Sequence, residues 1–219
     1  MAEFSDVVRS RRSSRMFLPD KPVPRELLDE ALALAMRAPS NSNTQPWHVF
    51  FATGERRVRL VDALLTAVEA APPAIGSAGL PPQFANLRRE TGALVYGAMG
   101  IARDDAAGRW AAQRHNWEFF KAPVAGRVCM HRDFGNVDAM GVGMFLQTLL
   151  LALNERGIGS CVQVSISFYP DVLREQLGIP TDLTILCGLS IGYADEAFAA
   201  NHLDTPRNPI SENVVFLDD

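Results

Sequence analysis

The longest apolar stretch of this chain, GVGMFLQTLLLALN at residues 141–154, constrains the fold more than any other feature. It carries a glutamine and lies between HRDF and NERG, so it is too short to cross a bilayer unaided. A helix with so few polar positions needs other apolar surfaces around it. We therefore expect either the core helix of a globular domain or a seam between subunits.

Helix and strand patterns alternate on both sides of this stretch. Apolar residues recur with helical spacing in RELLDEALALAMR, and further helices are expected over residues 55–70 and 104–120. Compact apolar runs predict strands in WHVFFAT, APVAGRVCM, GSCVQVS and LTILCGLSIGYA. Because no internal repeat or domain linker interrupts the 219 residues, we expect one α+β domain in which helices cover a sheet.

Two segments do not fit a regular element. Residues 72–105 begin with a run rich in Pro, Gly and Ala, which favours irregular structure and is typical of a lid. The tail, residues 200–219, shows no helical period and is long and polar for the core of its own domain. Both segments are expected to lie outside the core.

Composition and charge exclude several classes of function. A net charge of −4 gives no general reason to expect nucleic acid as a partner. The cysteines Cys129, Cys161 and Cys187 are isolated in apolar surroundings, and no His or Cys has metal-ligand spacing. Because the N-terminus also lacks an apolar signal segment, we expect a cytoplasmic protein with reduced cysteines, no metal and no membrane contact.

The segment RSRRSSR at residues 9–15 gathers four arginines and three serines at the end of a predicted helix. Guanidinium groups bind phosphate bidentately, and hydroxyl groups with free backbone amides add neutral donors. A solvated basic turn is the simpler interpretation of the segment taken alone. Both interpretations stay open on these residues.

A second polar segment, APSNSNTQPW at residues 38–47, follows one helix later and precedes a predicted strand. The pair RRSSR and APSNSNTQPW resembles the N-terminal half of the nitroreductase family of flavin enzymes. Towards the C-terminus, RGIGSCVQVSISFYPDVLREQLGIP, LCGLSIGYAD and NHLDTPRNPISENVVF resemble the nitrobenzoate-reductase-like branch of that family. The resemblance covers most of the chain.

The resemblance implies a fold and a partner. We expect a nitroreductase-like three-layer α/β/α sandwich with a central mixed β-sheet, formed by residues 1–219 as a single FMN-binding domain. The protein would be a homodimer with two FMN at the subunit interface and with exchanged C-terminal tails. Residues 72–105 would be a lid or insertion over the substrate pocket.

The resemblance also implies residue roles around the flavin. Arg11, Arg12 and Ser13 would hold the phosphate and the ribityl chain. Arg15 would reach the pyrimidine ring, where a positive charge stabilises the reduced flavin. The remaining cofactor-binding residues would be Pro39, Ser40, Asn41 and Asn43, partly from the second subunit, together with Asn116, Gln163, Val164, Ser165 and Arg207. Asn116 has a simpler interpretation as a helix cap, and Arg207 as a surface charge.

The function implied is an FMN-dependent oxidoreductase. Its ping-pong reaction would carry a hydride from NADPH or NADH to a nitroaromatic, a quinone or a similar electron-poor small molecule. No catalytic side chain is required, because the cofactor carries the chemistry. The alternatives are a reductive dehalogenase or a flavin-consuming enzyme of the same fold, a flavin-binding protein without turnover, and a protein whose basic segment is only a surface turn.

Overall fold

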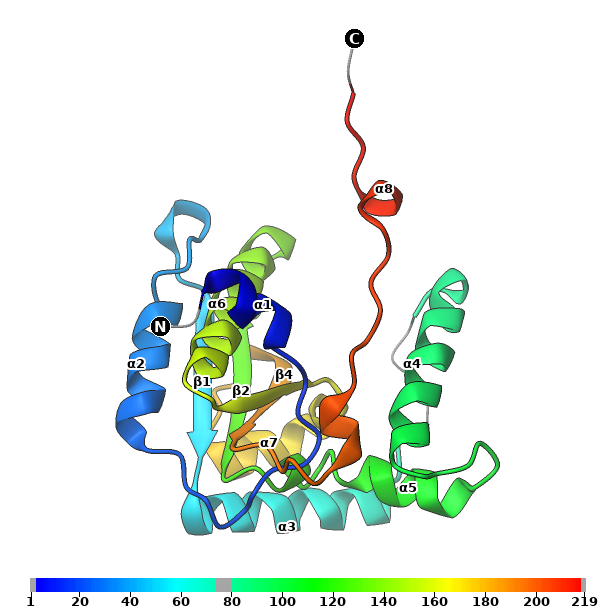
Figure 1. The fold of residues 1–219 in the computed structure, drawn as a ribbon. Helices are drawn as coiled ribbons and strands as arrows, with labels where there is room; N and C mark the ends of the chain where they lie inside the picture. Colours follow the sequence, from blue (N-terminus) through cyan, green and yellow to red (C-terminus); the bar gives the residue numbers. More distant parts are fainter. Residues whose placement is uncertain (1–2, 74–79, 218–219) are drawn as a thin grey trace.

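The computed structural model describes residues 3–73 and 80–217 (Figure 1). Four strands form one sheet in the order β1-β2-β4-β3. Their bounds are Trp47–Ala52 for β1, Val124–His131 for β2, Gly159–Gln163 for β3 and Leu183–Gly192 for β4. β1, β3 and β4 lie within the apolar runs that predicted strands, and β2 extends one residue beyond its run, to His131.

Neighbouring strands in this sheet are antiparallel, which corrects one detail of the expected mixed sheet. The helix between β2 and β3 returns the chain over the sheet, so these two strands point the same way. β4 comes back from the opposite end and fills the place between them, as an antiparallel neighbour of both. Within the described ranges, the parallel pairing is an isolated bridge between Ser13 and Ser160.

One face of the sheet is covered by α2 (Arg25–Ala35) and α6 (Asn136–Glu155), with α1 (Phe4–Ser10) packed on α6. α2 buries Leu28, Ala31 and Ala35, which its helical spacing places on one side. The Trp47 ring at the start of β1 stacks on Phe145 of α6, with ring centroids 5.0 Å apart. This contact fixes α6 against the sheet.

The other face is covered by α3 (Gly54–Ala70) and α7 (Pro170–Leu177). α3 buries Leu60, Leu64 and Val68, one turn apart along the helix. Pro170 occupies the first turn of α7, and Gly178 ends it in the left-handed region at φ 67°. With helices on both faces, the expected three-layer α/β/α arrangement is confirmed.

α6 has two contrasting sides. By length and composition it could cross a membrane, yet it packs against α2 and the sheet through Val142, Phe145, Leu149 and Leu153. The core-helix expectation is therefore confirmed for this side. On the other side, Val137, Met140 and Met144 are 54%, 61% and 41% exposed.

Two helices lie beside the sandwich, α4 (Ala85–Ala98) and α5 (Ala106–Arg114), and α4 has no buried residue (Figure 1). A short 3₁₀ turn, η2 (Pro82–Phe84), leads into α4, so the segment expected to be irregular contains a regular helix. Residues 74–79 of that segment lie outside the described residues.

The prediction of one continuous helix over residues 104–120 is wrong. α5 ends at Arg114, and the chain then turns into the 3₁₀ element η3 (Phe119–Lys121). Phe119, Phe120 and Lys121 all have positive φ angles, between 52° and 65°, which a helix does not allow. Both phenylalanine side chains are buried, so burial in the core has overridden the local helical preference.

The C-terminal tail leaves the body after η5 (Ala199–His202). Figure 1 shows it running away from the sandwich, interrupted by the single turn α8 (Ile210–Asn213). Beyond residue 209 its apolar side chains are exposed, at 73% for Ile210, 77% for Phe216 and 92% for Leu217. The expectation that the tail lies outside the core is confirmed beyond η5, whereas Ala200 and Asn201 within η5 are buried.

Candidate functional site

The basic segment lies along the outer edge of β3. The bridge between Ser13 and Ser160 attaches it there, and the backbone N–H of Ser14 donates to the Ser160 carbonyl at 3.0 Å. β3 is an edge strand whose free backbone groups can pair with another segment. The segment is therefore held by the sheet and is not a free surface turn.

Asn201 holds the next part of this segment. Its side-chain oxygen accepts from the Arg15 backbone N–H at 2.6 Å, and its amide nitrogen donates to the carbonyls of Met16 and Asp195. Asn201 is 4% exposed, so these bonds are made away from bulk water. Asn201 was not among the site residues predicted from the sequence. Its signal was only a single asparagine in a polar tail.

Three guanidinium groups of the segment have no carboxylate partner within the described ranges: those of Arg11, Arg12 and Arg15. Arg12 donates from Nε to the Ser10 carbonyl at 3.2 Å, and Arg15 donates from Nη1 to the Ser13 carbonyl, also at 3.2 Å. Arginine has five N–H donors, so most of the donors remain available. Such a set suits a phosphate or another anion.

The thiol of Cys161 lies beneath these arginines. Burial raises the pKa of this thiol to about 11, whereas Arg15, a hydrogen bond with Ser13 and Arg11 act in the opposite direction. The thiol therefore stays protonated at neutral pH and is not a nucleophile. Arg11, Ser13 and Arg15 therefore all lie close enough to Cys161 on β3 to act on its thiol.

Asn116 lies at the end of β3. Its backbone carbonyl accepts from Gln163 Nε2 at 2.9 Å, and its side-chain oxygen accepts from Ser165 Oγ at 3.4 Å. Gln163 is 3% exposed, and its Oε1 accepts from Ser190. The Gln163 side chain thus points inward and supports Asn116, so only its backbone remains available to a flavin. The neighbouring Val164 side chain is 56% exposed.

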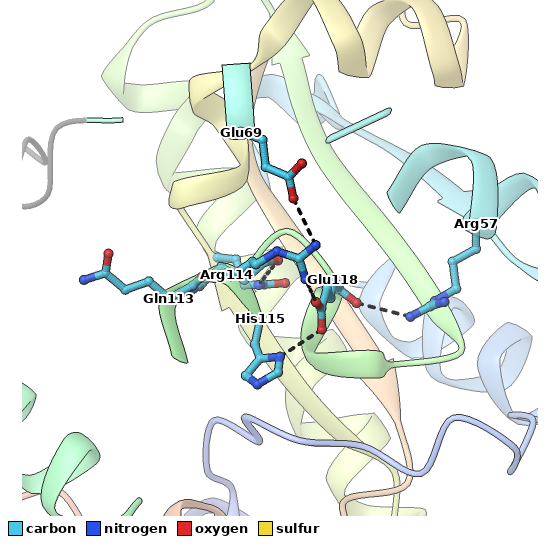
Figure 2. A network of polar contacts seen from close by, with 8 residues as sticks. Arg57, Glu69, Gln113, Arg114, His115 and Glu118 are labelled. Carbon is cyan, nitrogen blue, oxygen red and sulfur yellow. Dashed lines mark hydrogen bonds and ion pairs between the residues drawn. The ribbon is translucent and has the colours of Figure 1, made fainter. Parts of the chain in front are cut away.

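A polar network holds the turn that carries Asn116 (Figure 2). The Glu118 carboxylate accepts from Arg114 Nη1 at 2.5 Å and contacts His115 Nδ1 at 2.8 Å. Arg57 donates from Nη2 to the Glu118 carbonyl at 3.1 Å, and Arg114 also reaches Glu69. These bonds anchor the turn to α3 and maintain its strained left-handed backbone.

Arg127 supports the same turn from the sheet. This residue of β2 is fully buried, and its guanidinium carbon lies 4.4 Å from the centroid of the Phe119 ring. Burial lowers the pKa of Arg127 to about 9. A cation stacked on an aromatic face regains part of the hydration it has lost. The sheet and the turn are therefore joined by packing as well as by hydrogen bonds.

Arg15 and Asn116 line one cavity of 200 Å³ under α4. Phe120 and Gln113 lie on one side of it, and Thr91, Gly92, Val95, Tyr96 and Met99 contribute from the α4 side. The cavity joins the basic segment, the strained turn and the segment expected to form a lid. Of the predicted site residues, Arg15 and Asn116 line it.

The loop with Pro39, Ser40, Asn41 and Asn43 lies elsewhere. It packs on α6, where a Cβ atom added to Gly141 would lie 3.3 Å from the Cβ of Ser40. Ser42, Asn43 and Gln45 all have left-handed φ angles, and Ser40 Oγ accepts from the Gln45 N–H at 3.0 Å. No hydrogen bond or ion pair within residues 3–73 and 80–217 joins this loop to residues 11–15.

Arg207 is also separate from the basic segment. It lies on the exposed tail and donates from Nη1 to Thr205 and to the Pro206 carbonyl, at 2.7 to 3.0 Å. All its hydrogen bonds in the described structure are therefore to its own segment. Its predicted role on a phosphate remains a prediction.

Comparison with known proteins identifies the family of this chain. The sequence profile of the nitroreductase family matches residues 8–193. This chain belongs to the nitroreductase family. It is 39% identical over 94% of its length to 4-nitrobenzoate reductase of Pseudomonas putida, of which it covers 91%. The expected resemblance to the nitrobenzoate-reductase-like branch is confirmed.

Solved structures agree with this assignment. The FMN- and NADPH-dependent nitroreductase NfnB from Sphigopyxis sp. strain HMH has a TM-score of 0.93 at 34% identity, with both chains fully covered. The FMN-dependent nitroreductase NfnB from Mycobacterium smegmatis, solved in complex with NADPH, has a TM-score of 0.90 at 35% identity. The alignment with it covers 98% of this chain and 97% of that one. The nitroreductase fold is thus confirmed.

A single nitroreductase chain brings only part of the predicted site together. Around one end of β3 it gathers Arg11, Ser13, Arg15, Asn116 and Ser165, with Arg12 beside them. The loop at residues 39–43 and Arg207 lie on separate surfaces.

Proposed function

We propose that the protein is an FMN-dependent oxidoreductase that uses NADPH or NADH to reduce nitroaromatic compounds, quinones or similar electron-poor small molecules. The observation that carries the proposal is the cavity that Arg15 and Asn116 share under α4, because Arg15 belongs to a segment with three guanidinium groups that have no carboxylate partner among the described residues. Family membership and relatives named as FMN- and NADPH-dependent nitroreductases support the same activity.

The donor set fits FMN. Arg11, Arg12 and Ser13 would hold its phosphate and ribityl chain, because guanidinium groups and hydroxyls are good phosphate ligands. When bound, FMN accepts a hydride from the nicotinamide coenzyme and later passes it to the acceptor. The protein's own task is then to bind, orient and stabilise charge.

Arg15 would stabilise the negative charge of the reduced cofactor. Its backbone is fixed by Asn201 and its guanidinium lines the cavity, so the charge is positioned before the reaction. Asn116 would orient the cofactor from the other side, with Ser165 and Gln163 keeping its amide and carbonyl in place. Val164 and Ser165 would form the edge near the flavin N5 atom.

The working protein would be a homodimer. Three features of the single chain support this: the exposed apolar side of α6, the exposed apolar tail, and a strained polar loop at residues 39–43 far from the other site residues. A second copy would cover the α6 side and the tail. It would also bring the loop and Arg207 to the cofactor, which one chain alone does not.

α4 would act as the lid expected for residues 72–105. It contributes several residues to the wall of the Arg15 cavity and yet buries none of its own residues, so little packing fixes it.

We also infer a cytoplasmic location. The three free buried cysteines fit a reducing compartment, where pyridine nucleotides are supplied.

The experiment is anaerobic turnover of the FMN-loaded protein with NADPH and 4-nitrobenzoate, nitrobenzene or a quinone. Oxidation of NADPH that depends on the acceptor supports the proposal. Bound FMN without oxidation of NADPH by any acceptor indicates a binding protein. Halide release from halogenated aromatics, or loss of the flavin itself during turnover, indicates the other two activities of this fold.

A further inference from the structure

A second cavity, of 510 Å³, lies between α4 and α5. Four arginines line it, from α4, from the loop after α4 and from α5: Arg88, Arg89, Arg103 and Arg109. None of the described residues that line it is acidic, although the chain as a whole carries a net charge of −4. Positive charge is thus concentrated in this cavity although the net charge of the molecule is negative, and this favours an anionic ligand.

Two of these arginines are held in defined positions. The guanidinium carbon of Arg109 lies 4.3 Å from the centroid of the Tyr96 ring, and the Tyr96 hydroxyl accepts from Gln113 at 3.1 Å. Arg89 donates from Nη2 to the Asn86 side chain at 2.8 Å. Stacking uses the face of a guanidinium group and leaves its N–H edge for hydrogen bonds.

Two of the four arginines, Arg103 and Arg109, are not neutralised by carboxylates of the described residues. Within the described part of the chain, neither Arg103 nor Arg109 has a carboxylate within 4.0 Å. Arg103 lies on the exposed loop between α4 and α5, and Arg109 is half-buried. Both guanidinium groups can therefore face a ligand whose charge is opposite to theirs.

The cavity adjoins the proposed flavin site. Gly92, Tyr96 and Gln113 line both this cavity and the smaller one with Arg15 and Asn116. One ligand can therefore place a reacting end beside Arg15 and an anionic end between α4 and α5. A volume of 510 Å³ is larger than a single carboxylate of a small aromatic acceptor requires, and it lies in the usual range for a nucleotide-sized ligand.

We propose that the cavity between α4 and α5 binds the phosphate groups of the nicotinamide coenzyme, with Arg103 and Arg109 on the additional phosphate of NADPH. The inference rests on the proposed function and specifies it further, because this contact makes NADPH the preferred coenzyme over NADH. α4 then has two roles, as a wall of the flavin site and as a wall of the coenzyme site.

The test is calorimetric binding of two coenzyme fragments to the FMN-loaded protein. Adenosine 2′,5′-bisphosphate carries the additional phosphate, and adenosine 5′-monophosphate lacks it. We expect the bisphosphate to bind at least about tenfold more tightly, as one or two charge-assisted hydrogen bonds provide. This measurement needs no turnover, so it can succeed even if the proposed reaction is wrong.

The variants are Arg103→Gln and Arg109→Gln, each expected to remove most of the difference between the two fragments. The matched control is Arg59→Gln on α3, whose side chain is 63% exposed and lies outside the cavity. Arg103 lies on an exposed loop, so its variant remains informative even if Arg109→Gln folds poorly. Both variants should also lower the ratio of kcat/KM for NADPH to kcat/KM for NADH about tenfold.

Three results would overturn the proposal. The first is equal binding of the two fragments by the wild-type protein. The second is an unchanged difference in both variants. The third is a fall in the kcat/KM of both variants for 4-nitrobenzoate alone, with kcat/KM for nitrobenzene and for both coenzymes unchanged. That result would assign the arginines to the carboxylate of an acceptor.

Discussion

Asn201 Oδ1 accepts a hydrogen bond of 2.6 Å from the backbone N–H of Arg15, which lies 186 positions earlier in the chain. The same side chain donates to the carbonyls of Met16 and Asp195. One buried amide therefore joins the basic segment, the residues after β4 and the start of the tail. The position of Arg15 depends on this junction.

Replacing Asn201 tests the junction. Asn201→Ala leaves the Arg15 N–H without a partner, whereas the Met16 carbonyl still accepts from the Asp195 N–H. The free energy of unfolding should therefore fall by about 1–3 kcal/mol. The affinity for FMN should fall about tenfold or more, because Arg15 is no longer fixed. Urea unfolding and fluorescence titration with FMN measure the two effects.

His202→Ala is the control for this experiment. His202 is the next residue, its side chain is 50% exposed, and it bonds only to Glu196 in the described structure. Its replacement should change stability by less than about 0.5 kcal/mol. An Asn201→Ala protein that folds and binds FMN as tightly as the wild type would show that Asn201 does not position Arg15.

The glycine at position 141 should be necessary for the polar loop. A Cβ atom there would lie 3.3 Å from Ser40 Cβ and 3.4 Å from Pro46 Cγ, so Gly141→Ala should displace the loop at residues 39–43. Overpacking of this kind costs about 1–3 kcal/mol. At Gly97 in α4 a Cβ atom meets nothing within 4 Å.

Gly97→Ala is therefore the matched control, and helix propensity alone should raise its stability by up to about 1 kcal/mol. Thermal unfolding of the two variants should move in opposite directions. Equal stabilisation by both substitutions would mean that the loop accommodates a methyl group at position 141 without cost.

The sequence predicted most of the fold because local signals agreed with tertiary packing. α3 occurs where a helix was expected over residues 55–70, and the four strands occur at the apolar runs that predicted them. The turn after α5 was not predicted because Phe119 and Phe120 adopt a left-handed backbone conformation in which their side chains are buried. Arg127 and Arg57 hold this turn in place. Contacts from distant strands and helices do not appear in a local pattern.

The site was predictable only where a family motif marked it. The family resemblance named Arg15 and Asn116, which line one cavity, but it did not reveal that the Gln163 side chain faces inward. Which way a side chain at the end of a strand points depends on the register of β3 against β4. Asn201 and the arginine-lined cavity had no sequence signal, because both arise from segments that meet only in the folded chain.

Arg207 should contribute to FMN retention and little to folding. Arg207→Ala removes an exposed tail arginine that bonds only to its own segment in the single chain. If it closes on the FMN phosphate in the assembled protein, the Kd for FMN should rise about tenfold. Arg132→Ala, another exposed arginine with a side chain 65% exposed, is the control and should leave the Kd unchanged.

Dialysis at low protein concentration, followed by measurement of the flavin-to-protein ratio, gives the result for both variants. The same ratio in Arg207→Ala and in the wild type would rule out a role on the phosphate. A lower ratio in Arg207→Ala, together with a melting temperature of its FMN-free form below that of the FMN-free wild type, would instead indicate a role in folding.

The three cysteines should be unreactive in the native protein. Burial raises the pKa of Cys129, Cys161 and Cys187 to about 11. Near pH 8 their thiolate fraction is then roughly 100-fold below that of a thiol with its ordinary pKa. Reaction with a thiol reagent should be slow in buffer and should reach three equivalents rapidly in urea. A fast native thiol would contradict the burial of Cys161 beneath Arg15.

The central claim is that this chain binds FMN beside Arg15 and Asn116 and that a nicotinamide coenzyme reduces it there. The most direct test is the visible absorption spectrum of the purified protein, with FMN added if needed, before and after anaerobic NADPH. We expect a flavin spectrum that NADPH bleaches, and an Arg15→Ala protein that retains less flavin or is reduced more slowly. A protein that binds no flavin even after FMN is added would contradict the account.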